Sequence, residues 1–512
     1  MRLDRYYGKL LTRFDERPAL CFRDERLTYA EVDDHTARLA NVFRSMGLRE
    51  DRRVAILMRN RPEYLLTEIA VARAGAIAIP MNSRLDREHS TRIVTDAKAD
   101  ALVVGSQYFD VARELQQEHF ELKYIVGVAD DRELPVGFQR YDDLLRRGEP
   151  DPPTVDTKPD DVAAVFYTSG TTGPQKGVMH THEALALNAA AHVHELDIRR
   201  HERVLLTTPL AHSANFITRA ALAQGTTIVL HPGFDPERTL SAIRDHDVTW
   251  TFLVPTMLSR LLNDDALAET DVSSLETVVY GASSMPPALV ERGIETFGQV
   301  FVQIYGLMEA PDVVTTLHKH KHQPREGAVL NTVGYPTQYA DVRIDDNDDR
   351  WAENVGEIRV RSPFGMKGYY DQTSETPEWL RTGDLGRFDE AGRLVILDRI
   401  QDTIRVGDET VFSTRVENVV QRHPSVRQVA VIGVPAGREQ SRLPPRSEYV
   451  DQEVKAVVAT VEGGQLAVEG LREFCADHLA EHELPISVDF VGALPETPYG
   501  KVDKRSLRQP YW

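Results

Sequence analysis

The chain has 512 residues, of which 41% are hydrophobic, and a formal net charge of −19 at pH 7. This length exceeds what one hydrophobic core usually supports, so we expect at least two domains. The negative charge argues against general binding to nucleic acids or to membrane surfaces. The sequence has no apolar run long enough to span a membrane, no signal-peptide pattern at its start and only two cysteines. It therefore predicts a cytoplasmic protein without a disulfide framework.

Helical and strand patterns alternate along the first 160 residues. Thr28 and Glu31 have the spacing of a capping box, which predicts a helix that ends near Gly47. An apolar run at 54–58 predicts a strand, and a helix at 63–74 and a strand at 76–79 follow it. Further strands are expected at 226–230, 249–254 and 275–280. This alternation predicts an α/β fold with a large domain of mostly parallel sheets flanked by helices.

The segments from about 331 to 398 are shorter and richer in β-forming residues, which predicts a β-rich subdomain. Beyond it, a final unit has its own alternation of helices and strands. We expect an N-terminal domain over 1–400 and a small α+β C-terminal domain over 401–512, with the boundary at Gln401. A histidine-rich run at 318–322 could bind a transition metal, but a charged surface loop is the stronger interpretation.

The most informative stretch is a loop at 167–178 that is rich in glycine and in hydroxyl side chains. It follows an apolar run at 162–166 and precedes a helix predicted at 181–193. Glycines let backbone amides approach phosphates, hydroxyls donate hydrogen bonds to them, and a lysine offsets their charge. Lys176 precedes its glycine, so the loop is not a Walker A motif. The candidate phosphate-binding residues are Thr168, Ser169, Gly170, Thr171, Thr172, Gly173 and Lys176.

This loop resembles the phosphate-binding signature of the AMP-forming acyl-CoA synthetases, which belong to the superfamily of adenylate-forming (AMP-binding) enzymes. Other motifs of that family follow in the same order at 305–309, 382–384, 398–399 and 494–504. The resemblance implies an acid–thiol ligase. A carboxylate attacks ATP to give an acyl-adenylate and pyrophosphate, and a thiol then displaces AMP. It also implies ATP, Mg²⁺ and coenzyme A as co-substrates and cofactor, and it is compatible with a homodimer.

The resemblance also implies the roles of individual residues. Lys501 would stabilise the charge that builds at the α-phosphate in the transition state, and Lys176 would contact the phosphates. Thr168 and Glu309 would hold Mg²⁺. Asp384 suits the ribose because a carboxylate accepts two hydrogen bonds from a vicinal diol. The remaining nucleotide-binding candidates are Gly281, Ala282, Ser283, Gln303, Ile304, Tyr305, Gly306, Met308 and Arg399.

Three positions depart from the pattern of the family. Met308 stands where a threonine hydroxyl contacts the α-phosphate, so one hydrogen-bond donor is missing, which can cost on the order of 10²-fold in rate. Gln401 stands at the hinge about which the C-terminal domain turns between two poses, where lysine or aspartate is more usual. Asp408 follows Gly407 in the loop that lines the coenzyme A channel. This carboxylate is expected to affect thioester formation more than adenylation.

The family selects its carboxylic acid with a pocket that corresponds here to His212, Asn215, Phe216, Gly281, Gly306, Leu307 and Ala310. The segment 209–216 has no aspartate to pair a substrate ammonium, so an amino acid is not expected. The small apolar lining favours a medium- or long-chain fatty acid. An aryl acid is the alternative, because His212 with Asn215 could recognise a hydroxylated ring.

Two further alternatives concern the acceptor and the chemistry. The adenylate could pass to a carrier protein instead of coenzyme A, and the basic residues suited to either acceptor are Arg438, Arg442 and Arg446. The chain could also be a non-catalytic protein that binds a nucleotide or an acyl ligand, a reading motivated by the departures from the family pattern. The presence of Lys176, Glu309 and Lys501 weighs against that reading.

Overall fold

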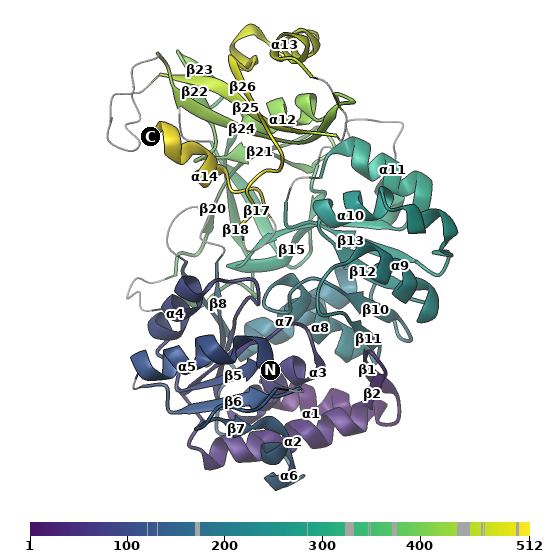
Figure 1. Cartoon of the computed structure of the whole chain (residues 1–512), viewed down its shortest axis with the longest axis vertical. Helices are drawn as coiled ribbons and strands as arrows, with labels where there is room; N and C mark the ends of the chain where they lie inside the picture. Colours follow the sequence, from purple (N-terminus) through teal and green to yellow (C-terminus); the bar gives the residue numbers. More distant parts are fainter. Residues whose placement is uncertain are drawn as a thin grey trace.

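Two large sheets form the body of the protein, and the C-terminal residues form a separate lobe at one end (Figure 1). No helix in the part of the chain that is described here is long and apolar enough to cross a membrane. The computed structural model describes residues 1–512 except 120, 131, 169–174, 284, 323–331, 347, 349, 371–375, 438–450, 462–463, 465 and 498–500.

One sheet of the body has eight strands in the order β19–β9–β8–β4–β3–β5–β6–β7. From β8 to β7 all neighbours are parallel, whereas β9 pairs antiparallel with both β8 and β19. The strands are β3 (Arg53–Leu57), β4 (Ile77–Pro80), β5 (Ala101–Gly105), β6 (Tyr124–Val128), β7 (Gln139–Arg140), β8 (Val162–Tyr167), β9 (Gly177–Thr181) and β19 (Gly368–Tyr369).

The other sheet of the body has nine strands in the order β16–β15–β14–β13–β12–β10–β11–β1–β2. Its strands are parallel from β14 to β1, and antiparallel strands flank them on both sides. The bounds are β1 (Pro18–Phe22), β2 (Glu25–Thr28), β10 (Arg203–Leu206), β11 (Thr227–Leu230), β12 (Trp250–Leu253), β13 (Thr277–Tyr280), β14 (Phe301–Leu307), β15 (Ala310–Leu317) and β16 (Tyr335–Pro336).

Helices cover these sheets and fill the space between them. They are α1 (Leu3–Phe14), α2 (Tyr29–Ser45), α3 (Pro62–Ala74), α4 (Arg87–Asp96), α5 (Phe109–Glu118), α6 (Tyr141–Arg147), α7 (His182–Glu195), α8 (Ser213–Gln224), α9 (Pro236–Asp245), α10 (Pro255–Leu262) and α11 (Pro287–Phe297). Every residue of α3 except Glu63 is buried, as expected for a helix enclosed on all sides. The main core joins Ile56 of one sheet to Leu206 of the other, which fixes the two sheets relative to each other.

Local sequence signals determine where several of these elements begin and end. The predicted capping box is present: the Glu31 N–H donates to the Thr28 hydroxyl, and the Glu31 carboxylate accepts from the Thr28 N–H. Gly75 adopts a left-handed conformation with φ of 80° and ends α3. Short 3₁₀ helices occur at η1 (Ser106–Tyr108), η2 (Asp265–Glu269), η3 (Lys319–Lys321), η4 (Glu481–Glu483) and η5 (Gln509–Tyr511).

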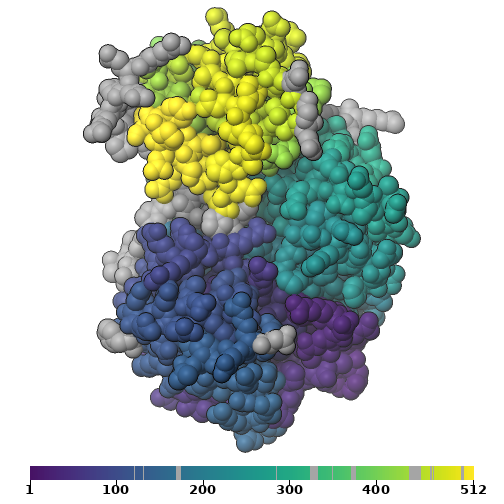
Figure 2. All heavy atoms as spheres, viewed as in Figure 1, coloured from purple at the N-terminus to yellow at the C-terminus, as the bar shows by residue number. Residues whose placement is uncertain are grey.

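The C-terminal third contains smaller sheets. An antiparallel sheet of β17 (Asp341–Asp345), β18 (Gly356–Arg361), β20 (Leu380–Phe388) and β21 (Leu394–Arg399) falls in the region predicted to be β-rich. The C-terminal lobe, green to yellow in Figure 2, has its own hydrophobic core. Its elements are β22 (Ile404–Val406), β23 (Glu409–Val411), α12 (Ser413–Val420), β24 (Val426–Pro435), β25 (Gln452–Thr460), α13 (Val468–Ala476), β26 (Ser487–Val491) and α14 (Lys504–Arg508). The predicted α/β fold class is confirmed.

One element corrects the expectation from the sequence. The glycine-rich loop does not lead directly into the helix predicted at 181–193, because β9 lies between them. The helix itself forms, with the Thr181 hydroxyl accepting a hydrogen bond from the Ala184 N–H at 3.1 Å. β9 has only five residues and its pattern is a weak strand signal, and it is stabilised by antiparallel pairing with β8. The phosphate loop is therefore the connection of a hairpin.

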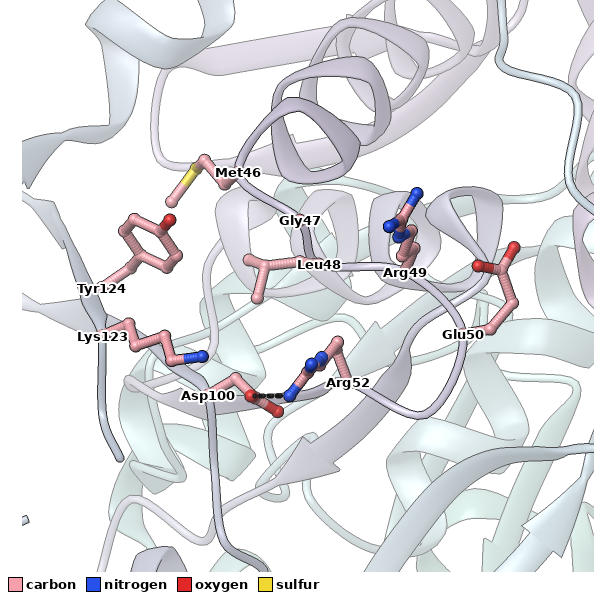
Figure 3. A pocket seen from close by; sticks show the side chains of 9 residues that line it. All are labelled: Met46, Gly47, Leu48, Arg49, Glu50, Arg52, Asp100, Lys123 and Tyr124. Atoms are coloured by element: carbon pink, nitrogen blue, oxygen red, sulfur yellow. Dashed lines mark hydrogen bonds and ion pairs between the residues drawn. The ribbon is translucent and has the colours of Figure 1, made fainter. Parts of the chain in front are cut away.

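The predicted functional segments follow the carboxyl ends of strands: Thr168 follows β8, His212 follows β10, Gly281 follows β13 and Glu309 follows β14. Ligands of open α/β sheets bind at this edge. A pocket shown in Figure 3 lies at the opposite edge, since its residues Arg52, Asp100 and Lys123 directly precede β3, β5 and β6. Arg52 and Asp100 form an ion pair of 3.0 Å there. This pocket is separate from the predicted site.

Candidate active site

Lys501 lies where the C-terminal lobe meets the body. Its backbone carbonyl accepts a hydrogen bond from the Thr497 N–H at 2.7 Å. The charges that act on its ammonium belong to Arg399, Asp384 and Asp312. Burial, and then the positive charge of Arg399, lower the pKa of Lys501 to about 8, while the two carboxylates act in the opposite direction. The predicted catalytic amine is thus brought to the segments predicted to bind the nucleotide.

The predicted ribose-binding residues lie side by side on two paired strands. Asp384 on β20 is directly opposite Arg399 on β21, and Arg399 Nε lies 3.3 Å from Asp384 Oδ1. The Tyr305 hydroxyl donates to Asp384 Oδ2 at 2.8 Å. The Thr382 hydroxyl accepts from the Asp384 N–H at 3.1 Å. Tyr305 was expected to stack on adenine, and the structure adds a contact that orients the Asp384 carboxylate.

The segment predicted to pack against adenine follows β13. Gly281 is close to β14, because a Cβ atom there would lie 2.6 Å from the carbonyl oxygen of Ile304. Ala282 has a left-handed backbone with φ of 66°, a conformation that costs energy for a residue with a side chain and is concentrated at functional sites. Ser283 beside it is exposed. This unusual backbone conformation lies just after the carboxyl end of β13.

Gln303, the candidate partner of the adenine amino group, is buried in a polar network. Its Oε1 accepts a hydrogen bond from the Tyr280 hydroxyl at 3.1 Å, and that hydroxyl lies 3.0 Å from His322 Nε2. Burial lowers the pKa of His322 to about 4. His322 belongs to the histidine-rich run considered for metal binding. Among the described residues, no group of three or more histidine, cysteine, aspartate or glutamate side chains is arranged so that it could hold a metal ion.

The predicted metal ligand Glu309 and the predicted phosphate lysine Lys176 share one neighbour, Tyr369. The Tyr369 hydroxyl donates to Glu309 Oε1 at 2.7 Å, and the Lys176 Nζ lies 4.9 Å from the centroid of the Tyr369 ring. The Thr168 hydroxyl accepts from the Lys176 N–H at 3.1 Å. Mg²⁺ is usually held by one or two carboxylates together with substrate phosphates, so a single carboxylate and a hydroxyl fit this ion. Ser169, Gly170, Thr171, Thr172 and Gly173 lie outside the described residues.

His180 was missed by the sequence analysis. It is buried on β9, and its Nε2–H donates to the backbone carbonyl of Met308 at 2.9 Å. Burial lowers the pKa of His180 to about 4, so its ring is neutral. This contact fixes the backbone of the turn between β14 and β15, next to Glu309. Only a three-dimensional contact marks this histidine, because nothing in its local pattern distinguishes it.

Asp312 was also missed. It lies on β15 with a left-handed backbone, φ of 63°. Its carboxylate accepts from the Ser213 hydroxyl at 2.8 Å and lies 3.3 Å from His192 Nε2. Ser213 directly follows His212, so β15 brings a carboxylate to the segment 209–216, which has none of its own. Burial, and then the charge of Lys501, lower the pKa of His212 to about 3.

The structure changes the interpretation of two predicted pocket residues. Asn215 is 1% exposed, and its side-chain amide donates to the buried carboxylate of Glu68 on α3. We therefore leave Asn215 out of the groups that recognise the acid. Phe216 is also buried and packs on Phe166 with ring centroids 4.9 Å apart. Of the remaining candidates, Ala310 is buried and Leu307 is half-buried. Gly306 is confined by the backbone of Asp312, whose nitrogen a Cβ would approach to 2.4 Å.

The predicted hinge and channel residues lie on the C-terminal side of β21. The Gln401 carbonyl accepts a hydrogen bond from Arg508 of α14 at 2.7 Å. Gly407 has φ of 59° in the turn between β22 and β23, and Asp408 beside it is exposed. Arg438, Arg442 and Arg446 lie outside the described residues.

Comparison with known proteins decides the family. The model of the family "AMP-binding enzyme" matches residues 10–370, and that of "AMP-binding enzyme C-terminal domain" matches 415–501. The chain belongs to the AMP-binding enzyme family. This confirms the predicted superfamily and its acid–thiol ligase class, in which ATP, Mg²⁺ and coenzyme A take part.

Relatives of this family member include several ligases. A feruloyl-CoA synthase from Amycolatopsis sp is 34% identical over 95% of this chain and 94% of its own length. A medium/long-chain-fatty-acid–CoA ligase, FadD8, from Mycobacterium tuberculosis is 33% identical over 98% of this chain and 89% of its own length. The solved structure of the amide bond synthetase McbA from Marinactinospora thermotolerans has a TM-score of 0.87 and 30% identity, with full coverage of both chains.

Proposed function

We propose that this family member activates an apolar carboxylic acid as its acyl-adenylate and transfers the acyl group to coenzyme A in the cytoplasm. The observation that carries the proposal is the position of Lys501. Its amine comes from the C-terminal lobe and lies close enough to Asp384 on β20 and Arg399 on β21 for their charges to act on it. A cation at this place can stabilise charge that builds only in the transition state.

The proposed first step joins the acid to AMP. An oxygen of the substrate carboxylate attacks the α-phosphorus of ATP, and the bond to the departing pyrophosphate breaks. Lys501 offsets the developing negative charge, Asp384 accepts hydrogen bonds from the ribose, and Lys176 contacts the outer phosphates. Glu309 and Thr168 would hold Mg²⁺, which would supply positive charge to neutralise the phosphates.

The proposed second step forms the thioester. The sulfur of coenzyme A attacks the acyl carbonyl carbon, and the bond to AMP breaks. We propose that the C-terminal domain, residues 401–512, turns about Gln401 between the two steps and brings the loop with Gly407 and Asp408 to the acyl group. A carrier protein as acceptor and a homodimer remain predictions.

For the acid, we propose a medium- or long-chain fatty acid. The small apolar candidates Gly281, Gly306 and Ala310 and the 33% identical fatty-acid ligase support this assignment. An aryl acid is the second candidate, because the feruloyl-CoA synthase is 34% identical to this chain. His212 is half-buried and neutral, and it could shield the carboxylate end of either acid.

A panel of carboxylic acids tests both the acid and the two steps. The enzyme with ATP and Mg²⁺ is given fatty acids of increasing chain length and hydroxylated aryl acids, and pyrophosphate release is measured first. Consumption of coenzyme A is measured next with the acids that give a signal. We expect acid-dependent pyrophosphate release that is strongest with medium or long fatty acids. Pyrophosphate release that does not depend on any acid would reject the proposal.

A further inference from the structure

Tyr369 contacts two groups that the proposed function assigns to the phosphates and the metal, yet it belongs to none of the motifs predicted from the sequence. Its hydroxyl donates to Glu309 Oε1 at 2.7 Å. Its ring lies 4.9 Å from the Lys176 ammonium. The two contacts use different parts of the side chain, so single substitutions can separate them.

The backbone fixes Tyr369 between these partners. β19 pairs antiparallel with β9, and Tyr369 is directly opposite Val178, two residues beyond Lys176. On one side of the pair, the Tyr370 N–H donates to the Gly177 carbonyl at 2.7 Å. On the other side, the Met366 N–H donates to the backbone carbonyl of Glu309 at 2.7 Å. The segment that carries Tyr369 is thus joined to the strand after the phosphate loop and to Glu309 itself.

The hydroxyl contact restricts the Glu309 carboxylate. A carboxylate can only accept here, so the phenol donates its proton and holds one of the two oxygens. A carboxylate has about four acceptor positions, so this bond leaves capacity for a cation. Hydrogen bonds from a second residue to a metal ligand orient the ligand, and removing them typically lowers metal affinity about 10–100-fold.

The ring contact restricts Lys176. The side chain of Lys176 is exposed, and a free lysine samples many conformations in water. A cation over an aromatic face gains electrostatic attraction from the ring. The ring thus keeps the ammonium at the end of the phosphate loop, where the outer phosphates of ATP are proposed to bind.

We propose that Tyr369 is a positioning residue that holds Glu309 for Mg²⁺ through its hydroxyl and Lys176 for the phosphates of ATP through its ring. This inference rests on the proposed function, because it uses the roles assigned there to Glu309 and Lys176. Tyr369 itself touches neither the acid nor the reacting phosphorus in the proposed reaction.

Calorimetric titration of the full chain with ATP, without any acid, tests the inference in a binding readout. Affinity is measured in EDTA and at increasing Mg²⁺ concentrations. In Tyr369→Phe the ring remains, so ATP affinity in EDTA should stay within about twofold of wild type. The Mg²⁺ concentration that gives half of the full effect of Mg²⁺ on ATP affinity should rise about tenfold or more. Tyr369→Leu should show the same Mg²⁺ defect and, in addition, about threefold weaker ATP binding in EDTA.

Tyr370→Phe is the matched control, because it removes the neighbouring hydroxyl, which reaches the Ala97 carbonyl at 3.4 Å instead of Glu309. It should behave like wild type. An Mg²⁺ response of Tyr369→Phe equal to that of wild type would overturn the inference. So would an equal shift in Tyr370→Phe, because the effect would then come from the strand and not from the contact with Glu309.

Glu309→Gln separates this inference from the proposed function. If Glu309 holds the metal, this variant should lose most of the Mg²⁺ effect on ATP binding. Loss in Glu309→Gln with no change in Tyr369→Phe would reject only the role of Tyr369. A wild-type chain that binds no ATP, or a Glu309→Gln variant with a normal Mg²⁺ response, would reject the assignments from which the inference starts.

Discussion

Lys501 is expected to lose its proton within the working range of an enzyme, because its pKa is lowered from 10.5 to about 8 by burial and by Arg399. Below about pH 8 the side chain is an ammonium, and above about pH 8 it is a neutral amine that offsets no negative charge. The kcat/KM for ATP in pyrophosphate release should therefore fall about tenfold per pH unit above pH 8, since this quantity reports the pKa values of the free enzyme.

Lys501→Arg is the control for this prediction. A guanidinium stays charged throughout this pH range, so the decline above pH 8 should disappear even if the overall rate is lower. Thioester formation from a supplied acyl-adenylate should have the same pH profile in wild type and in Lys501→Arg. A wild-type profile that stays flat to about pH 9.5 would show that the reacting enzyme does not depend on this proton.

Met308→Thr should raise the rate of adenylation. The backbone at this position is already fixed by the hydrogen bond from His180, so a threonine can present its hydroxyl without rebuilding the turn. One donor to the α-phosphate can change the rate on the order of 10²-fold, and we expect a gain of at least about tenfold. Pyrophosphate release with a saturating acid measures it. An unchanged rate would mean that another group already supplies this hydrogen bond.

At the scale of elements, a buried ion pair joins α3 to α8 beneath the candidate site. Arg219 is 3% exposed and Glu68 is 7% exposed, and Arg219 also lies over the ring of Phe216 at 5.6 Å. Removing one partner of such a pair leaves an isolated buried charge. We therefore expect Arg219→Met to lower the free energy of unfolding by about 3–5 kcal/mol at pH 8.

The loss of stability in Arg219→Met should depend on pH through the Glu68 carboxyl. Burial raises the pKa of Glu68 above 4.5, and Arg219 opposes that shift. Without Arg219 the folded-state pKa rises further above the unfolded value, so the loss of stability grows as pH rises above about 4.5. Urea unfolding should show that Arg219→Met loses less free energy of unfolding, relative to wild type, at pH 5 than at pH 8. Glu68→Leu with Arg219→Met should recover most of the stability, and a double variant as unstable as the single one would contradict the argument.

Elements with local signals were predictable from the sequence, and elements that depend on distant partners were not. The capping box of Thr28 and Glu31 marks the start of α2, and Gly75 marks the end of α3. Both signals are local, so the two helices were predicted to within a few residues. β9 was missed because only its pairing with β8 makes it a strand. The strands predicted at 226–230, 249–254 and 275–280 correspond to β11, β12 and β13, and each of these is a short run of mostly buried residues.

In the candidate site, too, residues within motifs were predictable, whereas residues defined by distant contacts were not. Motif order pointed to Asp384 and Arg399, and the register of β20 and β21 explains why residues 15 positions apart face each other. By contrast, Asp312 meets Ser213 across 99 positions, and Tyr369 meets Glu309 across 60. No local pattern encodes such contacts. Asn215 illustrates the opposite error, because its partner Glu68 lies 147 positions away and draws its side chain toward α3.

At the scale of the whole molecule, a chain of hydrogen bonds crosses the proposed hinge. Asp398, before Gln401, is buried and accepts from the Ser413 hydroxyl at 3.0 Å. That hydroxyl in turn accepts from Lys504 Nζ at 2.8 Å, and Lys504 lies three residues after Lys501. Ser413 thus connects β21, the last strand before the proposed hinge, to the segment that carries the proposed catalytic amine of Lys501. We expect this connection to stabilise the arrangement in which Lys501 lies near Asp384 and Arg399.

Ser413→Ala should therefore slow adenylation while sparing the thiol step. A hydrogen bond of this kind contributes about 1 kcal/mol, so pyrophosphate release should fall about fivefold. Thioester formation from a supplied acyl-adenylate should stay the same or rise, because we expect this connection to favour only the arrangement proposed for adenylation. Thr414→Ala is the matched control: its hydroxyl also donates to Asp398, at 3.3 Å, but it does not reach Lys504. A parallel loss of both half-reactions in Ser413→Ala would mean that the serine only supports the fold of the C-terminal lobe, and the link between hinge and catalytic pose would then be wrong.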